Sequence, residues 1–317
     1  MKELLVSEIP PFRNLRIQVE VTTHCNVQCK MCVRPQMIKQ VGARHLDWDV
    51  FVKVVEQAPP GSRFCLQGTG EPFLHPRFYD MIALCKQRGF YVETYTNGLC
   101  FEPSRVVESK LDFLVQSLLG GDGPGNDARM KGGDFSTVLT NLEALNECKR
   151  ERNAERPKLG FNYCVMRDNV DEMIEVVALA ARLNVVYIEF NPVGDNSELL
   201  ASHSEIQRVR PAVDEAAKAA GIRIQLYDFQ PGTHPRYLTC SWPWTGYYIT
   251  VDGRVGPCCT RPHLASAWIP GHVNEIENMQ ALWESKAYQA FRRALATHRK
   301  ESVPQMCKEC VEYEVDE

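Results

Sequence analysis

The chain has 317 residues, with 36 basic and 40 acidic side chains, a formal net charge of −4 and a pI near 6.1. This balance excludes the basic surface field that non-specific nucleic-acid binding requires, so we expect no nucleic-acid partner. The sequence shows neither an apolar signal-peptide core nor a run of about 18 apolar residues, which predicts a cytoplasmic protein with no membrane contact.

The 13 cysteines point to metal ligation or redox chemistry, because disulfides are rare in a reducing compartment. Three of them, Cys25, Cys29 and Cys32, lie in the stretch HCNVQCKMCV, directly after a predicted strand. Zinc stays open on counting alone, since His24 could complete four ligands, but C-x3-C-x2-C differs from the usual zinc pattern. Iron–sulfur clusters normally take four thiolates at short spacings, so three thiolates would leave one iron open to a substrate or cofactor.

Strands and amphipathic helices alternate along the first two thirds of the chain. Apolar residues recur at helical spacing in residues 47–58, 75–89, 134–151 and 171–184. The predicted strands are residues 16–23, 63–68, 91–98, 113–119, 158–166 and 185–193. Six such units predict a parallel sheet with right-handed crossovers.

Glycine and polar residues follow several of these strands. GTGEP at residues 68–72 by itself indicates a glycine turn before a helix. Asn97-Gly98 would usually indicate a hairpin, but the helix-like segment that follows favours a strand-to-helix turn. Asn162 and Asn191 lie in or end later strands, and they either face a substrate or are satisfied turn residues.

Cysteines return in the C-terminal third, after a linker-like stretch at residues 230–237. A hairpin is predicted at residues 246–259 with Asp252-Gly253 at its turn, followed by a helix from Met279 to about residue 300. On the residues alone, Cys240, Cys258, Cys307 and Cys310 could close around zinc. The cysteines inside predicted strands and helices are expected in the core: Cys65, Cys85, Cys100, Cys148 and Cys164.

The C-x3-C-x2-C motif, the GTGEP loop and the second cysteine set together resemble the radical S-adenosylmethionine (SAM) superfamily, in its SPASM/twitch subgroup. The resemblance implies an α/β fold: a partial (βα)6 TIM-like barrel in residues 1–229 and a small twitch-type cysteine-rich domain, a β-hairpin plus a helix, in residues 230–317. The site belongs at the C-terminal ends of the strands. Met31 departs from the family's usual aromatic residue, and Thr69 replaces a glycine of its GGEP loop.

The resemblance also implies SAM and two 4Fe–4S clusters as cofactors. Cys25, Cys29 and Cys32 would hold the SAM-cleaving cluster. The auxiliary cluster would be held by Cys240, Cys258, Cys307 and Cys310. SAM would be contacted by Gly68, Gly70, Glu71, Asn97, Ser117 and Arg129. Glu71 is expected near the amino group and Arg129 near the carboxylate, although on residues alone Arg129 is equally a surface charge. The cluster requires a low-potential electron donor such as flavodoxin or ferredoxin.

The implied activity is reductive cleavage of SAM to a 5′-deoxyadenosyl radical, which abstracts hydrogen from a small polar metabolite of amino-sugar or cyclitol type. The layout is similar to twitch enzymes such as neomycin epimerase and the butirosin-pathway dehydrogenase. Epimerisation is the main expectation, with Cys259 as candidate hydrogen donor.

Three alternatives to this activity remain open. One is dehydrogenation of a secondary alcohol with the auxiliary cluster as electron acceptor and Arg167, Asp168 or Arg261 as base. Another is maturation of a ribosomally made peptide, which the roughly fifteen residues before the first strand disfavour because they are too few for a leader-binding domain. The last is a non-enzymatic zinc or iron–sulfur scaffold.

Overall fold

A computed structural model describes residues 10–193, 198–226, 240–259, 271–297 and 301–308. All six predicted strands are present, and each is parallel to its neighbours, which confirms the α/β partial barrel. The strands are β1 (Arg16–Val19), β3 (Arg63–Leu66), β4 (Tyr91–Thr96), β5 (Phe113–Leu118), β7 (Lys158–Val165) and β8 (Tyr187–Pro192).

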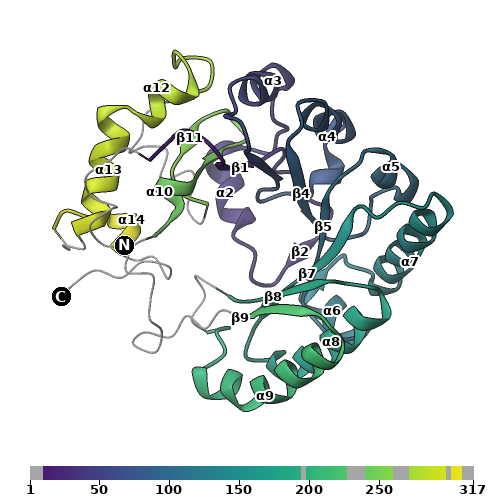
Figure 1. Cartoon of the computed structure of the whole chain (residues 1–317). Helices are drawn as coiled ribbons and strands as arrows, with labels where there is room; N and C mark the ends of the chain where they lie inside the picture. The colour runs from purple at the N-terminus through teal and green to yellow at the C-terminus, as the bar shows by residue number, and fades with distance from the viewer. Residues whose placement is uncertain (1–9, 194–197, 227–239, 260–270, 298–300, 309–317) are drawn as a thin grey trace.

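Helices cover the outer face of the curved sheet (Figure 1). Each predicted amphipathic stretch contains one, and an aspartate begins two of them: the Asp47 carboxylate accepts from the N–H groups of Asp49 and Val50, and Asp134 caps the helix over residues 135–151 in the same way. The four predicted stretches contain α3 (Trp48–Glu56), α4 (Phe78–Gln87), α7 (Phe135–Glu151) and α8 (Met173–Arg182), and α5 (Pro103–Glu108) is a further helix between β4 and β5. None of the described helices is long and apolar enough to cross a membrane.

A seventh helix–strand unit extends the sheet beyond the six predicted ones. α9 (His203–Ala219) begins with a capping box between Ser202 and Glu205, and β9 (Arg223–Leu226) pairs in parallel with β8. The sequence pattern gave no prediction here, because Pro211 interrupts the helix interior and β9 is short and only half-buried.

The predicted C-terminal hairpin is present and joins the barrel sheet. β10 (Gly246–Ile249) pairs in parallel with β1, and β11 (Val255–Gly256) is antiparallel to β10. A Cβ on Gly246 would lie 2.1 Å from the Arg16 carbonyl oxygen, so this position admits glycine alone at the observed spacing. Within the described residues the result is one nine-stranded sheet in the order β11-β10-β1-β3-β4-β5-β7-β8-β9. The predicted linker and domain boundary near residue 230 lie outside the described residues.

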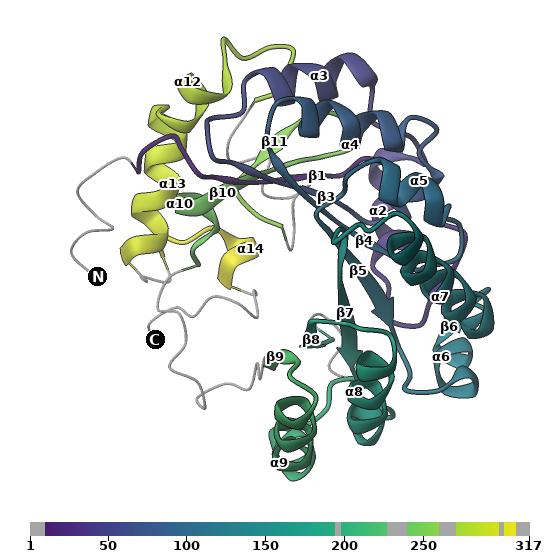
Figure 2. The ribbon, with the colours of Figure 1, turned by 45° about the vertical axis from the view of Figure 1, so that its right-hand side comes forward.

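The predicted single C-terminal helix is two helices, α12 (Met279–Trp283) and α13 (Lys286–Thr297). The break is at Ser285, whose hydroxyl accepts from the N–H of Tyr288 at 3.2 Å and so begins α13. α10 (Trp242–Thr245) packs between β10 and α13, and α14 (Gln305–Lys308) follows (Figure 2).

A single apolar core joins the barrel and the C-terminal helices. It contains Phe51, Phe161 and Phe190 from the barrel together with Trp283 and Leu295 from the C-terminal part. The two parts therefore pack as one body in the described residues.

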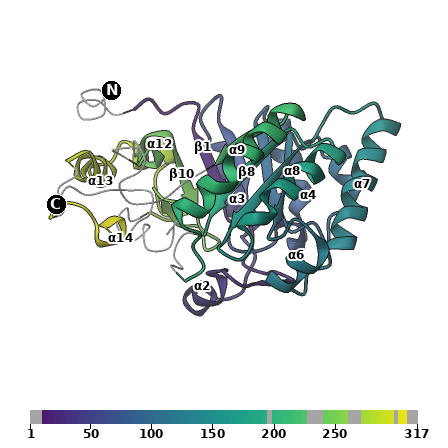
Figure 3. The ribbon, with the colours of Figure 1, turned by 90° about the horizontal axis from the view of Figure 1, so that it is seen from below.

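The smaller elements gather at one end of the barrel. α2 (Arg34–Val41) comes after the end of β1, and α6 (Gly123–Arg129) comes after the end of β5. Figure 3 shows both at the same end, where the strands finish and the predicted site lies.

Candidate functional site

The loop that carries the first three cysteines is held in place from both sides. β2 (Gln28–Cys29) pairs with β6 (Met130–Lys131), which fixes Cys29 against the segment after α6. At the start of the loop, the buried Thr23 hydroxyl donates to the Gly42 carbonyl at 3.0 Å. Cys25, Cys29 and Cys32 are all half-buried at the C-terminal end of the barrel.

The three thiols are electrostatic neighbours. Burial raises the pKa of Cys25, and Cys32 adds to the rise. Burial, together with the nearby Cys32 and Cys25, raises the pKa of Cys29 to about 12. Without a cation the Cys25 and Cys29 thiols stay protonated at neutral pH, and a bound metal would displace these protons. No group of three or more His, Cys, Asp or Glu side chains in the described ranges is already arranged to hold a metal ion, so their ligand role stays a prediction.

The GTGEP loop packs directly on the cysteine loop. The N–H of Glu71 donates to the His24 carbonyl at 2.8 Å. A Cβ on Gly70 would lie 2.4 Å from that same oxygen, and a Cβ on Gly68 would lie 2.3 Å from the Glu20 side chain. Both glycines therefore allow a contact that no larger residue could make, and the contact at Gly70 holds the GTGEP loop against the start of the cysteine loop.

Glu20, which the sequence analysis missed, connects this loop to the C-terminal hairpin. Its side chain is fully buried at the end of β1. Its Oε1 accepts from the N–H and the hydroxyl of Thr69 at 3.1 and 2.8 Å, and its Oε2 accepts from the N–H of Val251 at 3.0 Å. Thr69, the departure from the family's glycine, thus has a partner of its own. In the sequence Glu20 is one of several polar residues that alternate with Ile17, Val19 and Val21, so nothing there marks it as buried.

Glu71 holds the GTGEP loop to the end of β4. Its side chain is 2% exposed. Oε1 accepts from the Thr96 hydroxyl at 2.8 Å and from the N–H of Phe73 at 3.2 Å, and Oε2 accepts from the N–H of Asn97 at 2.7 Å. Burial nevertheless raises the pKa of this carboxyl to about 7. The structure therefore engages Glu71 with protein donors, and the predicted contact to a SAM amino group stays a prediction.

Asn97 ties the end of β4 to the cysteine loop. Its Nδ2 donates to Asn26 Oδ1 at 2.7 Å, next to Cys25. Gly98 follows with φ +83°, which confirms the predicted strand-to-helix turn. The structure thus brings Gly70, Glu71 and Asn97 together around the cysteine loop, and their contact with SAM stays a prediction.

Arg129 is not a solvated surface charge. Its guanidinium binds the Glu172 carboxylate through two nitrogens at 2.8 and 3.2 Å, and another ion pair joins it to Asp168. The Arg129 nitrogens that were expected to bind the SAM carboxylate are therefore paired with a protein carboxylate. The role of Arg129 in SAM binding stays a prediction. Ser117 is half-buried at the end of β5, paired in register with Asn162.

Of the three bases proposed for a dehydrogenation, Asp168 is poorly suited. Burial acts to raise the pKa of Asp168, but Lys30 at 2.9 Å and the Arg129 guanidinium lower it overall, so its carboxylate accepts protons weakly. Arg261 lies outside the described residues, and Arg167 begins the turn after β7.

The barrel interior presents amides and a thiol near the cysteine loop. The Asn191 amide donates to Asn162 Oδ1 at 2.6 Å, across β7 and β8. Cys164, two residues after Asn162 in β7, is half-buried and contributes to the raised pKa of Cys29. Cys164 packs against a small apolar cluster that includes Val27 and Met166, so its predicted place in the core holds in part. Because β7 alternates, Cys164 shares its face of the strand with Asn162. Cys65 and Cys85 are fully buried, as predicted.

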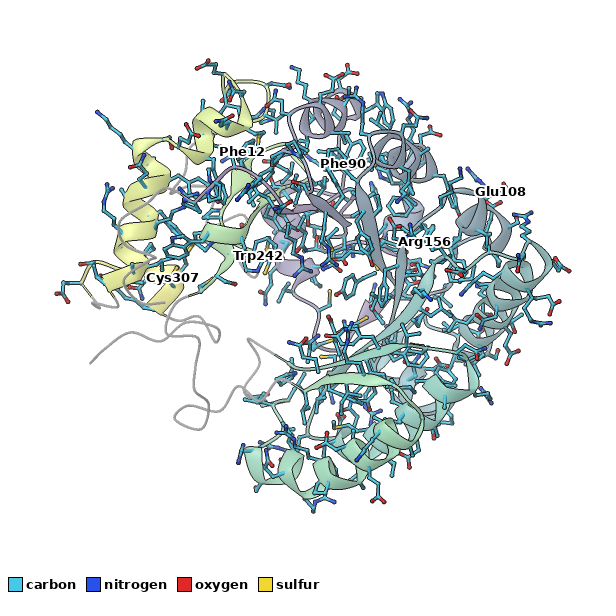
Figure 4. All side chains as sticks on the ribbon, viewed as in Figure 1. Phe12, Phe90, Glu108, Arg156, Trp242 and Cys307 are labelled. Atoms are coloured by element: carbon cyan, nitrogen blue, oxygen red, sulfur yellow. The ribbon has the colours of Figure 1, made fainter. Side chains whose placement is uncertain are left out.

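The described members of the second cysteine set come from separate elements of the C-terminal part. Cys240 precedes α10, Cys258 follows β11 and Cys307 lies in α14 (Figure 4), whereas Cys310 lies outside the described residues. Burial raises the pKa of the Tyr288 hydroxyl, and both Cys240 and Cys258 add to this rise. The fold thus brings these two thiols to the same side chain, although 18 positions separate them.

Cys258 and Cys259 share one neighbour and differ in another. Burial raises the pKa of Tyr248 well above its usual range, and Glu20, Cys259, Cys65 and Cys258 add to the rise. Tyr248 pairs in register with Gln18 of β1 and belongs to the sheet. Cys259 therefore influences a sheet residue, whereas Cys258 also influences Tyr288 in the C-terminal helices.

Two protein-family models match the chain. The Radical SAM superfamily matches residues 19–181, and the SPASM model, an iron–sulfur cluster-binding domain, matches residues 240–311. The chain belongs to the radical SAM superfamily. Membership brings SAM and a 4Fe–4S cluster as cofactors, and the C-terminal domain is of the SPASM iron–sulfur type.

Several proteins are similar to this radical SAM chain over most of its length. The tungsten-containing aldehyde ferredoxin oxidoreductase cofactor-modifying protein of Pyrococcus furiosus is 24% identical over 298 residues, which is 87% of this chain and 82% of the relative. The PqqA peptide cyclase of Gluconobacter oxydans is 21% identical over 322 residues, 96% of this chain and 85% of the relative. The crystal structure of Streptococcus suis SuiB bound to precursor peptide SuiA has a TM-score of 0.71 at 14% identity, covering 97% of this chain and 76% of SuiB.

The residues of this radical SAM chain fit the cofactors that the family implies. Cys25 and Cys32 both act on the pKa of Cys29, and thiolates are soft donors of the kind that iron–sulfur clusters take. Gly70 lets the GTGEP loop pack closely against the backbone of residues 22–24, just before these cysteines. In the C-terminal part, the buried guanidinium of Arg292 has a nitrogen without a hydrogen-bond partner, which suits a site for an anionic group.

Proposed function

We propose that this chain is a radical SAM enzyme that modifies a peptide. The observation that carries the proposal is the extent of the similarity: the PqqA peptide cyclase and peptide-bound SuiB each match 96–97% of this chain, barrel and cysteine-rich part together. These relatives favour the peptide alternative over the amino-sugar or cyclitol substrate that the sequence analysis put first.

The shape and lining of the barrel also support a peptide substrate. In the described residues β9 has a strand partner on one side only, and an unpaired strand edge is a place where an extended peptide can pair. The interior amides of Asn162 and Asn191 carry both donors and acceptors, as a peptide backbone does.

In this proposal Cys25, Cys29 and Cys32 hold the SAM-cleaving cluster, which supplies a carbon radical when SAM is bound and a low-potential donor reduces it. The protein binds and orients: Gly68 and Gly70 give the loop its close approach to the cysteines, and Asn97 and Glu71 hold that loop to the strand ends. Ser117 in β5 and Arg129 at the end of α6 are the other proposed SAM contacts. Cys240, Cys258, Cys307 and Cys310 are the proposed ligands of one auxiliary cluster.

A second candidate is epimerisation at a carbon of the substrate, with Cys259 as hydrogen-atom donor. The supporting observation is that Cys259 influences Tyr248 of the sheet, whereas Cys258 also influences Tyr288. In such a step the thiol S–H bond breaks, a C–H bond forms on the opposite face, and the electron donor and a proton restore the thiol. The auxiliary cluster would instead accept an electron if the substrate were oxidised.

The test is anaerobic reconstitution with iron and sulfide, followed by reduction with SAM in deuterated buffer. One sample receives a synthetic peptide library and a parallel sample receives amino-sugars and cyclitols. We expect 5′-deoxyadenosine and a mass loss of two in library peptides, with no change in the sugars. Deuterium gained by a peptide at one carbon, and lost in Cys259→Ala, would support the epimerase candidate. Turnover of the sugars alone would overturn the peptide proposal.

A further inference from the structure

Arg292 is a buried arginine without a carboxylate partner. It lies in α13 and is 4% exposed. Its Nε donates to the Pro243 carbonyl at 2.7 Å and its Nη1 to the Trp283 carbonyl at 2.8 Å. The guanidinium lies over the rings of Trp283 and Tyr288, at 4.1 and 4.2 Å from their centroids. Its Nη2 has no hydrogen-bond partner, and no ion pair involves Arg292 in the described part of the chain.

A guanidinium in this position is electrostatically unsatisfied. Burial lowers the pKa of Arg292 to about 10, and the neighbouring Tyr288 only partly offsets this. Carbonyl oxygens and aromatic faces supply partial negative charge, whereas a buried cation normally has a full counter-charge. The fold therefore holds a positive charge in place without an anion from its own described residues.

The neighbours of Arg292 indicate where that anion binds. Pro243, which accepts from Nε, is three residues after Cys240 and belongs to α10. Tyr288, one turn before Arg292 on α13, is influenced by Cys240 and Cys258. Arg292 lies over the Tyr288 ring, and Cys240, Cys258 and Cys307 all pack against the apolar core to which Tyr288 belongs. Thiolates around an iron–sulfur cluster carry a net negative charge, which increases on reduction.

We propose that Arg292 is the counter-ion of the auxiliary cluster, and that it raises the reduction potential of that cluster. The proposal rests on the proposed cluster ligation by Cys240, Cys258 and Cys307. Arg292 acts as a positioning residue: it binds no iron, but its charge favours the more negative, reduced form. Second-shell groups and local charge are among the determinants of cluster potential.

The test uses the full chain carrying Cys25→Ala, Cys29→Ala and Cys32→Ala, so that any remaining cluster is the auxiliary one. Iron content is measured first, and the midpoint potential is then followed by a spectroscopic redox titration. In this background Arg292→Gln removes the charge but keeps a hydrogen-bond donor. Arg293→Gln, at the exposed neighbouring position, is the matched control. We expect a lower midpoint potential for Arg292→Gln, no shift for Arg293→Gln, and recovery in Arg292→Lys.

The possible failures are distinguishable. If the background protein binds no iron, the auxiliary-cluster proposal is wrong, and the Arg292 proposal falls with it. If iron is bound and Arg292→Gln leaves the potential unchanged, the role of Arg292 alone is wrong. Should Arg292→Gln not fold, Arg292→Lys carries the test, because a buried lysine loses its proton more readily than arginine. The midpoint potential of the cluster in Arg292→Lys should then fall more steeply with rising pH than the potential in the background protein that keeps Arg292. The same pH dependence in both proteins would overturn the proposal.

Discussion

Single residues at this site are held by contacts that leave little freedom of substitution. Glu71 accepts three hydrogen bonds and Gly70 meets a carbonyl oxygen where a Cβ would stand. The cysteine motif and the GTGEP loop could be recognised in the sequence because their signal is local spacing. Glu20 and Arg292 could not, since their partners Val251 and Pro243 lie 231 and 49 positions away. A charged residue in an apolar segment shows no partner until the chain is folded.

The buried Glu71 carboxyl should make stability depend on pH. Its pKa rises from an ordinary value near 4.5 to about 7 on folding, so between these values the folded state binds more protons than the unfolded state. Stability should therefore be highest below pH 4.5 as far as this group is concerned, and should fall as pH rises through 7, by about 1–3 kcal/mol.

Glu71→Gln provides the control for this prediction, because a glutamine does not titrate. Urea unfolding of both proteins, without cofactors, at pH 5 and pH 8 isolates the contribution of Glu71. Glu71→Gln lowers the free energy of unfolding by an amount that does not depend on pH, because an amide replaces the carboxylate that accepts from the Asn97 N–H. An equal change in both proteins between the two pH values would show that Glu71 stays ionised.

Gly70→Ala should separate the GTGEP loop from the cysteine loop. The new Cβ would stand 2.4 Å from the His24 carbonyl oxygen, so one backbone segment must shift, at a cost of about 1–3 kcal/mol. SAM binding, measured by calorimetry on the reconstituted protein, should weaken as well. Gly123→Ala is the control, because its nearest neighbour would be the Phe135 ring at 3.7 Å. Unchanged unfolding and SAM binding in Gly70→Ala would contradict the close approach of these loops.

At the scale of elements, local patterning predicted the barrel strands but not how distant segments meet. All six strands and the hairpin turn at Asp252-Gly253 followed from alternation and turn chemistry. The parallel pairing of β10 with β1 depends on Gly246 approaching Arg16, a contact between segments 230 positions apart. The break at Ser285 was hidden because both α12 and α13 continue the same apolar periodicity.

The carboxylate of Glu20 joins three elements, and Thr69→Val tests that junction. Valine keeps the shape of threonine but removes the hydroxyl that donates to Glu20 at 2.8 Å, leaving the backbone bond in place. We expect a loss of about 1–2 kcal/mol in the free energy of unfolding, because a hydrogen bond to a buried charge is lost. Thr140→Val, which removes an exposed hydroxyl bond within α7, should cost less. Equal losses would mean that the junction adds nothing beyond an ordinary hydroxyl contact.

At the scale of the whole molecule, the two cysteine sets are separate ligand sets, but one sheet and one apolar core connect the parts of the fold that carry them. β10 follows Cys240 in the chain and pairs with β1, and the first cysteine loop follows directly after β1. One apolar core also extends from the barrel into α13. The family's two-part layout could be predicted from the cysteine spacing. That the second part completes the sheet of the first could not, because pairing with a distant strand leaves no mark in local sequence.

This layout predicts that the two cysteine sets can be emptied independently. Cys29→Ala should abolish reductive cleavage of SAM and remove about four iron atoms per chain, whereas Cys307→Ala should remove about four and leave cleavage intact. Cys148→Ala, in α7 and outside both sets, is the control. Iron and sulfide analysis, with 5′-deoxyadenosine measured after reduction, distinguishes these cases. Retained SAM cleavage in Cys29→Ala would refute that ligand assignment. Loss of all iron in Cys307→Ala would instead show that the shared core makes each cluster depend on the other.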